Sequence, residues 1–548
     1  MTAGGPTADE RGATGERGAS AGDEGAARAS DRLPIAPTVA SGVVAAAVLL
    51  PLLWLVRTAL AGGPGEAVAL LARPETLRVF VNSAALVAAV TGASILLGVP
   101  LAYLTVRTDL PLRRSLTVAV SLPLVVPSYI GAFAFVSAFG PKGAFQRVLA
   151  PLGVESLPRI YGFAGATLVL TLYTYPYVYI TTRAALASLD TRLVDAARTL
   201  DHSRWEAFRR VTVPQIRPAV AAGSLLVALY TLSDFGTPAI MRFDAFTRVI
   251  YVEFTTFGRD LAALLSLLLV AVTLVILALE SRVRGTGPLY AVGGRHGDTV
   301  PLGRWTAPAV LFCAAVPALA LVVPLLILGA WFVNGASGGA ALDFRMEYVF
   351  NSVGVSGATA VAATAAALPV AYLAARHRSR LTESFERATY VGYAVPGVVL
   401  GLALVYLGTS YATPIYQTLY LLVFAYVVRF LPQAVGSLRA SFLRVDPALP
   451  EAARTLGRTS AGAFRAVTLP LVAPGLLGGW ALVFLTTMKE LPATLLLAPT
   501  GFDTLVTRIW SAYGQGYFGY AVIPALILLG VSALSMLLII SQEGYDVR

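Results

Sequence analysis

Long apolar runs separated by short polar segments dominate the chain. A helix needs about 20 mostly apolar residues to cross the hydrocarbon core of a bilayer. Twelve runs approach or exceed that length, so we predict an all-α integral membrane protein with about twelve transmembrane helices. The fifth and eleventh runs are short and lead directly into charged residues. The predicted spans are 38–60, 80–106, 116–139, 161–182, 219–233, 261–279, 307–332, 351–375, 390–408, 415–433, 474–488 and 521–540.

Residues 1–34 differ from the rest, being rich in Gly, Ala, Ser and charged residues with almost no large apolar side chains. Such a segment cannot bury enough apolar surface to become ordered. We therefore expect a disordered cytoplasmic tail. It does not have the pattern of a secretory signal peptide, because acidic residues precede the first apolar run and that run is long.

Basic residues indicate the orientation of the spans, since Lys and Arg are enriched in cytoplasmic loops. With the N-terminus inside, 29 of the 41 basic residues fall in cytoplasmic segments, six of them in residues 429–473. We therefore expect a multi-pass protein of the plasma membrane with both termini in the cytoplasm.

Composition supports a bilayer environment and argues against several other classes. Charged residues make up only 13% of the chain, about half of their usual share in a soluble domain. The net charge of +11 agrees with the loop bias, so we expect no nucleic-acid binding. Cys313 is the only cysteine, which excludes disulfides within the chain and cysteine metal clusters. The three histidines all lie outside the apolar runs, and the sequence identifies no metal ligands.

The sequence repeats itself, first at an offset of 269 residues. The Asn-Ser pair at 82–83 and the Pro-Leu-Ala-Tyr-Leu run at 100–104 return as Asn-Ser at 351–352 and Pro-Val-Ala-Tyr-Leu at 369–373. These matches place the second and eighth spans in corresponding positions.

Prolines also recur, with Pro127 matching Pro396 at the first offset and Pro176 matching Pro432 at an offset of 256. Because proline removes a helical hydrogen bond, each is a candidate for a kink. Such kinks would let one half rock against the other, although static packing is an equal alternative.

A second block repeats at the offset of 256 residues. Residues 195–200, Asp-Ala-Ala-Arg-Thr-Leu, match residues 451–456, Glu-Ala-Ala-Arg-Thr-Leu. The blocks lie in cytoplasmic loops six spans apart, so the halves share one orientation and form a parallel repeat with a pathway at its interface. We therefore expect a first six-helix half over 35–284, a cytoplasmic linker over 285–306 and a second six-helix half over 307–548.

This repeated loop resembles the EAA loop of ABC importer permeases, whose pattern is Glu-Ala-Ala, three residues, Gly, nine residues and Ile-x-Leu-Pro. The second copy follows the pattern at Glu451, Ala452, Ala453, Gly457 and Pro470, with Val in place of Ile at position 467.

The first copy departs more from the pattern. It keeps the carboxylate and both alanines at Asp195, Ala196 and Ala197, has Asp201 where the family has Gly, and closes at Pro214. We expect both copies to dock, and whether they dock equally strongly is left open.

The resemblance implies the partners of the chain. In this family the EAA segment is a helix that sits in a cleft of a cytoplasmic ATPase and transmits its closure to the membrane helices. One fused chain then implies two ATPase subunits on the cytoplasmic face and an extracytoplasmic substrate-binding protein. Residues 190–200 and 446–456 suit short helices with Asp190 or Asp446 near the N-terminal end.

No phosphate-binding G-x-x-x-x-G-K-[ST] sequence occurs in the chain. We therefore expect ATP and Mg on the partner ATPase, no cofactor bound by this chain, and no enzymatic activity of its own.

Polar residues end the fifth and eleventh spans at matching positions. At the offset of 256, Ser233 and Asp234 correspond to Lys489 and Glu490. Acidic residues at membrane depth are costly and usually face a pathway or a partner charge. These four are our candidate translocation-pathway residues, and interfacial anchoring at helix ends is an equal alternative.

These stretches, with residues 243–251 and 501–504, resemble the ferric-iron permease branch, where fused twelve-helix chains are typical. The resemblance implies import of Fe(III), a hard cation that prefers oxygen ligands. The similar thiamine branch is the alternative, since a thiamine cation would be attracted by the same carboxylates. Its rings would then contact aromatic residues such as Tyr173, Tyr175, Tyr177 and Tyr230.

Other classes of membrane protein fit less well. A secondary transporter shares the two-half architecture but needs no ATPase docking loop, and a passive channel has no use for two such loops. A membrane-embedded enzyme would show clustered His, Asp and Glu in its spans. Co-purification with an ATPase would distinguish the importer from all three.

Overall fold

The computed structural model describes residues 33–61, 63–140, 145–146, 150–153, 160–189, 199, 203–256, 258–286, 299–336, 344–377 and 379–542. This part of the chain is helical apart from turns and one isolated bridge between Thr108 and Val300. Nearly all of the expected tail and residues 287–298 of the expected linker lie outside the described residues.

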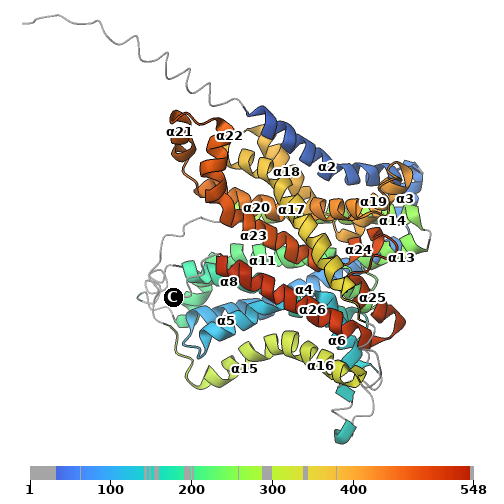
Figure 1. Ribbon diagram of the computed structural model, residues 1–548. Helices are drawn as coiled ribbons and strands as arrows, with labels where there is room; N and C mark the ends of the chain where they lie inside the picture. Colours follow the sequence, from blue (N-terminus) through green and yellow to red (C-terminus); the bar gives the residue numbers. More distant parts are fainter. Residues whose placement is uncertain are drawn as a thin grey trace, which may run out of the picture.

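Helices pack along one another in a bundle, with α21 and α22 at one end and α13 and α25 at the other (Figure 1). The first part of the chain contains α2 (Ile35–Ala59), α3 (Pro64–Leu71), α4 (Pro74–Arg107), α5 (Arg113–Ser121), η1 (Leu122–Val125), α6 (Ser128–Phe139), η2 (Ala150–Leu152), α8 (Phe163–Ser188), α10 (Arg204–Ala207), η3 (Phe208–Thr212), α11 (Val213–Ser233), α12 (Gly236–Ile240), α13 (Phe246–Thr255) and α14 (Arg259–Thr286).

The second part follows the same order. It contains η4 (Gly303–Trp305), α15 (Thr306–Pro317), η5 (Ala318–Val322), α16 (Val323–Ala336), α17 (Glu347–Arg376), α18 (Arg380–Ala394), α19 (Gly397–Ser410), α20 (Leu419–Arg444), α21 (Ala448–Thr455), α22 (Ser460–Ala463), η7 (Phe464–Thr468), α23 (Leu469–Met488), α24 (Pro492–Leu497), α25 (Leu505–Gln515) and α26 (Phe518–Gln542).

Eight helices of the described residues are long and apolar enough to cross a membrane, or up to ten if each of two bent pairs forms one span. The all-helical membrane class is confirmed, whereas this criterion does not reach the expected twelve. The remaining two predicted spans coincide with α8, which is rich in Thr and Tyr, and with α26, whose apolar described stretch Phe518–Leu534 is short.

The fifth and eleventh spans are not short, contrary to the sequence prediction. Continuous helices run over Trp205–Ser233 and Ser460–Met488, each 29 residues long. Their first turns carry arginines, which lowered the local hydropathy and made these turns look like loop. Each helix contains a wider π-helical turn just before Pro214 or Pro470, the second residue of α11 and α23. Since proline cannot donate the next helical hydrogen bond, the extra residue of the wide turn accommodates it.

The expected bends at Pro127 and Pro396 are confirmed. The chain turns by 92° between Val125 and Ser128, and by 102° between α18 and α19. Each proline lies immediately before the next helix with φ near −60° and an extended ψ, a geometry that its ring favours. Pro176 and Pro432, by contrast, lie inside α8 and α20 without a break.

The repeated Asn-Ser pairs hold equivalent loops in both halves. Asn82 and Asn351 donate from Nδ2 to the carbonyl oxygens of Asp244 and Asp503, at 3.2 and 2.9 Å. The neighbouring serine hydroxyls accept from the backbone N–H groups that start α13 and α25, at 3.0 and 2.8 Å. The Asn-Ser repeat therefore marks a structural anchor that α4 and α17 provide for the segment after the fifth and eleventh spans.

The two halves are interlocked through their first helices. Helix α2 packs against α17, α18 and α19 of the second half, whereas α15 and α16 pack against α5 and α6 of the first half. Each half therefore covers apolar surface of the other, and the central region lies between α11 and α12 on one side and α23 and α24 on the other.

Candidate functional site

A cavity of about 480 Å³ lies between the two halves. The ends of α11 and α23, the N-termini of α6 and α12, and the middle of α20 contribute to its walls. Ser233, Asp234, Lys489 and Glu490, the four residues predicted from the sequence to face a pathway, all line this cavity. The structure therefore brings together the two pairs that the repeat had matched.

Asp234 directly follows α11 and lies two residues before the short helix α12. Its Oδ2 accepts a 2.9 Å hydrogen bond from the Thr237 backbone N–H, and its Oδ1 accepts a 2.6 Å bond from the Ser128 hydroxyl. Tyr230 in turn donates to Ser128 Oγ at 3.3 Å. Since each carboxylate oxygen already accepts a bond, this acid both stops α11 and ties α6 to α12.

Glu490 occupies the equivalent place in the second half but has different partners. Its Oε1 accepts a 3.2 Å bond from the Ala493 N–H, as Asp234 does from Thr237 three residues on. Its Oε2 lies 3.3 Å from Nε of Arg429, and the Glu490 side chain is only 6% exposed. The first half relies on a neutral hydroxyl at this point, whereas the second half uses a buried ion pair.

Gly397 makes room for this ion pair. It is the register equivalent of Ser128, and a Cβ placed on it would lie 2.2 Å from both Arg429 Nη1 and Glu490 Oε1. The guanidinium therefore occupies the space where the first half has the Ser128 side chain. Only glycine at position 397 leaves enough space for the pair.

Lys489 follows the last residue of α23 and lines the cavity. Among the described residues we find no hydrogen bond or ion pair of its ammonium group. The sequence left a pathway position and interfacial anchoring open for this lysine. The structure places it beside the cavity, at the position where the first half has Ser233.

Arg429 is a charged residue of the cavity lining that the sequence analysis did not include among its candidates. It was counted among the cytoplasmic positive charges of residues 429–473, but it lies buried in the middle of α20, which continues to Arg444. The sequence contains a signal that points to Arg429, because this residue falls inside the predicted span 415–433. A charged residue inside a span marks a functional candidate.

The aromatic residues suggested for a thiamine site divide into two groups. Tyr177 and Tyr230 line the cavity, with ring centroids 6.1 Å apart. Tyr173 and Tyr175 do not line it, since their hydroxyls donate to the backbone carbonyls of Ala320 and Val120, both at 2.9 Å. Tyr129 and Tyr393, which the sequence analysis did not name, also line the cavity.

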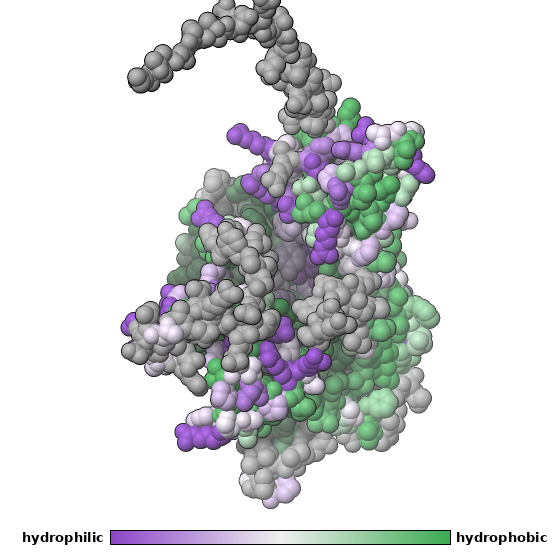
Figure 2. Space-filling view, turned by 90° about the vertical axis from the view of Figure 1, so that its left-hand side faces the viewer, coloured by the Kyte–Doolittle hydropathy of each residue, from purple (hydrophilic) through white to green (hydrophobic). Residues whose placement is uncertain are grey.

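The second EAA copy forms a short exposed helix at the end of the bundle. Asp446 lies two residues before α21, near its N-terminal end as the sequence predicted, and its Oδ1 accepts from the Ala448 N–H at 2.9 Å. Glu451 and Ala452 are exposed on α21, and Leu456 just after it is 85% exposed. Figure 2 shows this end of the molecule, where hydrophilic residues gather, with hydrophobic surface on the flanks.

Gly457 follows α21 (Ala448–Thr455) in a left-handed conformation, with φ of +85°. Its N–H donates to the Arg454 carbonyl at 3.0 Å, and the N–H of Arg458 donates to the Ala453 carbonyl at 3.1 Å. This pair of bonds is the Schellman motif, which favours glycine at the left-handed position. In the first copy, Asp195, Ala196, Ala197 and Asp201 lie outside the described residues, and only Pro214 can be placed.

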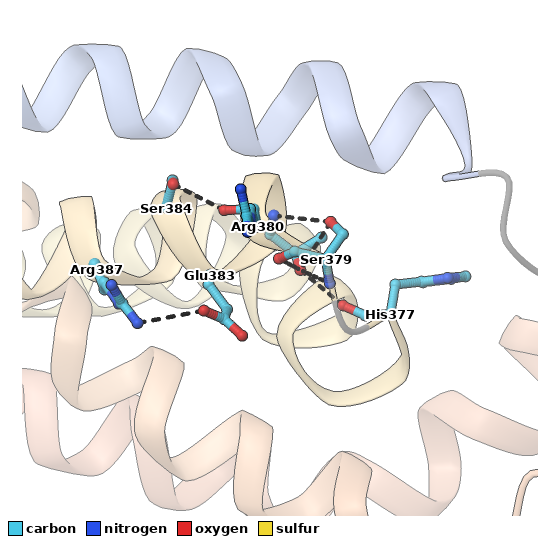
Figure 3. Close-up of polar contacts among 7 residues, drawn as sticks. His377, Ser379, Arg380, Glu383, Ser384 and Arg387 are labelled. Atoms are coloured by element: carbon cyan, nitrogen blue, oxygen red, sulfur yellow. Dashed lines mark hydrogen bonds and ion pairs between the residues drawn. The ribbon is translucent and has the colours of Figure 1, made fainter.

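Helix α18 begins with a hydrogen-bonded cap (Figure 3). Ser379 Oγ accepts from the Thr382 N–H at 3.2 Å, and Thr382 Oγ1 accepts from the Ser379 N–H at 3.1 Å, forming a capping box at the start of α18. Glu383 and Arg387 form an exposed ion pair of 3.3 Å one turn further on, while His377 points away from them. The capping box therefore fixes the start of α18.

Comparison with known proteins identifies the repeat independently. The family described as binding-protein-dependent transport system inner membrane component matches residues 94–285 and 367–542. The chain is 32% identical over 500 residues to an Fe(3+)-transport system permease protein of Haemophilus influenzae, covering 89% of this chain and 95% of that protein. It is 27% identical over 447 residues to a probable ABC transporter permease protein of Sinorhizobium fredii, covering 75% and 77%. A putative ferric transport system permease protein of Haemophilus influenzae is 25% identical over 473 residues, covering 82% and 74%.

Proposed function

The chain belongs to the family of binding-protein-dependent transport system inner membrane components, and we propose that it is the permease subunit of an ABC importer that moves ferric iron into the cell. It is a multi-pass inner membrane protein. The relatives named for ferric transport are permease subunits that match this chain over most of its length, which supports the same role here.

The observation that carries this proposal is the cavity between the halves, lined at equivalent positions by Asp234 and Glu490. A parallel repeat places a pathway at its interface, where alternating access exposes one central site to each side in turn. Oxygen-rich side chains at that interface suit a substrate that contains a hard cation.

Energy would come from a separate ATPase, which the family implies together with a substrate-binding protein. We assign one ATPase subunit to each EAA copy, hence two per chain, with Asp195, Ala196, Ala197 and Asp201 in the first site. Exposed α21 with its small Ala452 supports this assignment, because a partner can approach its backbone closely. ATP and Mg would bind to those subunits, and this chain would bind no cofactor.

The proposed topology has twelve spans, with both termini and both EAA copies on the cytoplasmic side. It divides the chain into halves over 35–284 and 307–548, joined by a linker. Support comes from the equivalent order of helices on each side of the linker and from the two bent pairs, each counted as one span. The substrate-binding protein would then dock at the end that holds α13 and α25.

The experiment measures ⁵⁵Fe(III) uptake by cells that express the chain with its ATPase and binding protein. The double variant Asp195→Arg/Glu451→Arg reverses the charge of both docking copies. We expect uptake to fall to background while the variant chain stays in the membrane and no longer co-purifies with the ATPase. Glu383→Arg, an exposed acid outside the EAA copies, is the matched control and should transport normally.

Two other outcomes would reject parts of the proposal. If cells with the unaltered chain take up no iron but the ATPase still co-purifies, iron is rejected as the substrate. The chain then remains the permease of an ABC importer. Labelled thiamine is then the next substrate, since Tyr177 and Tyr230 in the cavity present two aromatic faces to a ring system. If the unaltered chain binds no ATPase, the ABC importer is rejected. A secondary transporter is then the next hypothesis.

A further inference from the structure

The two walls of the central cavity carry opposite net charge. Four charged residues line it: Asp234 from the first half, and Arg429, Lys489 and Glu490 from the second. The first wall therefore has one negative charge, and the second wall has two positive charges and one negative. Within the described residues, the lining of the cavity has a formal charge of zero.

This asymmetry arises from particular substitutions between the halves. The two acids are equivalent at the offset of 256 residues, but Lys489 stands where the first half has Ser233, and Arg429 where it has Tyr173. Both cations of the cavity thus come from the second half. A path for a bare trivalent cation would gain nothing from them, because like charges repel strongly in a medium of low dielectric constant.

The carboxylates are also poorly placed to bind a bare ion. All four of their oxygens already have partners, namely the hydroxyl of Ser128, two backbone N–H groups and the guanidinium of Arg429. No group of three or more His, Cys, Asp or Glu residues that could hold a metal ion occurs in the described part of the chain. A hard trivalent cation would therefore have to bring most of its own oxygen ligands.

A cationic donor lines the cavity without a partner. The Lys489 ammonium has no hydrogen bond or ion pair among the described residues, and Lys489 is partly buried beside the cavity. A charged hydrogen bond to an acceptor oxygen of a bound group would therefore stabilise it. Ammonium and guanidinium groups are the usual binders of carboxylate and phosphate.

The cavity is large enough for a metal complex. Six waters around a metal ion occupy about 180 Å³, at about 30 Å³ each. The cavity of about 480 Å³ is larger and falls in the range of small-molecule sites.

Building on the proposed function, we propose that iron crosses this permease as a complex with a small oxygen-donor anion bearing carboxylate or phosphate groups, and that Lys489 binds that anion. The metal side of the complex faces Asp234, and free oxygens of the anion accept from Lys489. The near-zero charge of the lining then matches a complex whose ligand offsets the charge of iron.

The test measures entry of two labels in cells that express the chain with its ATPase and binding protein. ⁵⁵Fe(III) is supplied with ¹⁴C-citrate in one arm and with ³²P-phosphate in the other, and each anion is also supplied without iron. We expect one of the anions to enter with iron at a fixed ratio, in an amount beyond its entry without iron. The arm that shows this distinguishes a carboxylate from a phosphate ligand.

Three variants test the role of the lysine. Lys489→Gln should lower iron and anion uptake together by about tenfold or more, the loss of one charged hydrogen bond, and Lys489→Arg should keep most of both. The exchange Ser233→Lys/Lys489→Ser moves the cation to the equivalent position and should restore part of the uptake. This exchange keeps the charge of the lining, so its recovery excludes misfolding as the cause of the loss.

Iron entry without either anion, or undiminished uptake by Lys489→Gln, would overturn this inference and leave the ferric permease intact. If the unaltered chain takes up no more iron than the Asp195→Arg/Glu451→Arg variant, both this inference and the proposed ferric permease are overturned.

Discussion

The guanidinium of Arg376 donates a 2.8 Å hydrogen bond to the backbone carbonyl of Val445. Arg376 is the last residue of α17, and Val445 directly follows α20 and lies three residues before the docking helix α21. The first half repeats the contact, with Arg107 at the end of α4 donating to the Leu189 carbonyl at 3.2 Å. Each half therefore ties the end of its second helix to the base of its EAA copy.

We expect Arg376→Ala to impair coupling without removing the docking helix. A hydrogen bond from a charged group contributes about 1.5–3 kcal/mol, so its loss should let α21 move without pulling α17. Iron uptake should fall several-fold while the ATPase still co-purifies with the chain. The measurement is uptake per unit of co-purified ATPase.

Arg380→Ala is the matched control, since Arg380 is an exposed arginine four residues away at the start of α18. Equal uptake by Arg376→Ala and Arg380→Ala would show that the contact to Val445 has no role in coupling. Arg107→Ala should reproduce the defect from the other half.

Loss of one partner of the buried ion pair of Arg429 and Glu490 should destabilise the fold more than loss of both partners. Arg429→Met leaves Glu490 buried without its counter-charge, and breaking such a pair typically costs about 3–5 kcal/mol. The double variant Arg429→Met/Glu490→Gln leaves no uncompensated charge and should be clearly less destabilised. Melting midpoints of the purified chains in detergent measure the difference, and a double variant as unstable as the sum of the single ones would contradict it.

Gly397→Ala should disrupt the same ion pair by steric clash, without changing either charged residue. Its added Cβ would lie 2.2 Å from atoms of both Arg429 and Glu490, so one of the two must move. We expect a lower melting midpoint and reduced uptake. Gly357→Ala in α17 is the control, because nothing lies within 4 Å of the added carbon. Alanine is favoured over glycine in a helix by roughly 0.5–1 kcal/mol, so this control should be neutral or slightly stabilised.

Sequence patterns predicted the parts of the fold that depend on local chemistry. Apolar runs located the helices, proline placed the bends at Pro127 and Pro396, and Asp446 marked the start of α21. The repeat alone matches Asp234 with Glu490. These features follow from neighbouring residues, which is why one sequence was enough.

Contacts between distant helices were beyond the reach of those patterns. The count of basic residues assigned Arg429 to a cytoplasmic segment, and only the structure shows that α20 places it beside Glu490. The Asn-Ser repeat was found but not explained, since its partners Asp244 and Asp503 lie more than 150 residues away along the chain. Arginines in the first turns of the fifth and eleventh spans likewise hid the true length of those helices.

The left-handed conformation of Gly457 predicts which residues its position accepts. A β-branched residue is least able to adopt a positive φ, whereas Asp and Asn adopt it more readily than other non-glycine residues. The first EAA copy has Asp201 at the equivalent position, so the family geometry can be reached there with an aspartate. We expect Gly457→Val to weaken ATPase co-purification strongly, and Gly457→Asp to retain most of it. If the two variants bound the ATPase equally well, the end of α21 would not depend on this backbone conformation, and Asp201 would no longer be a reason to expect docking at the first copy.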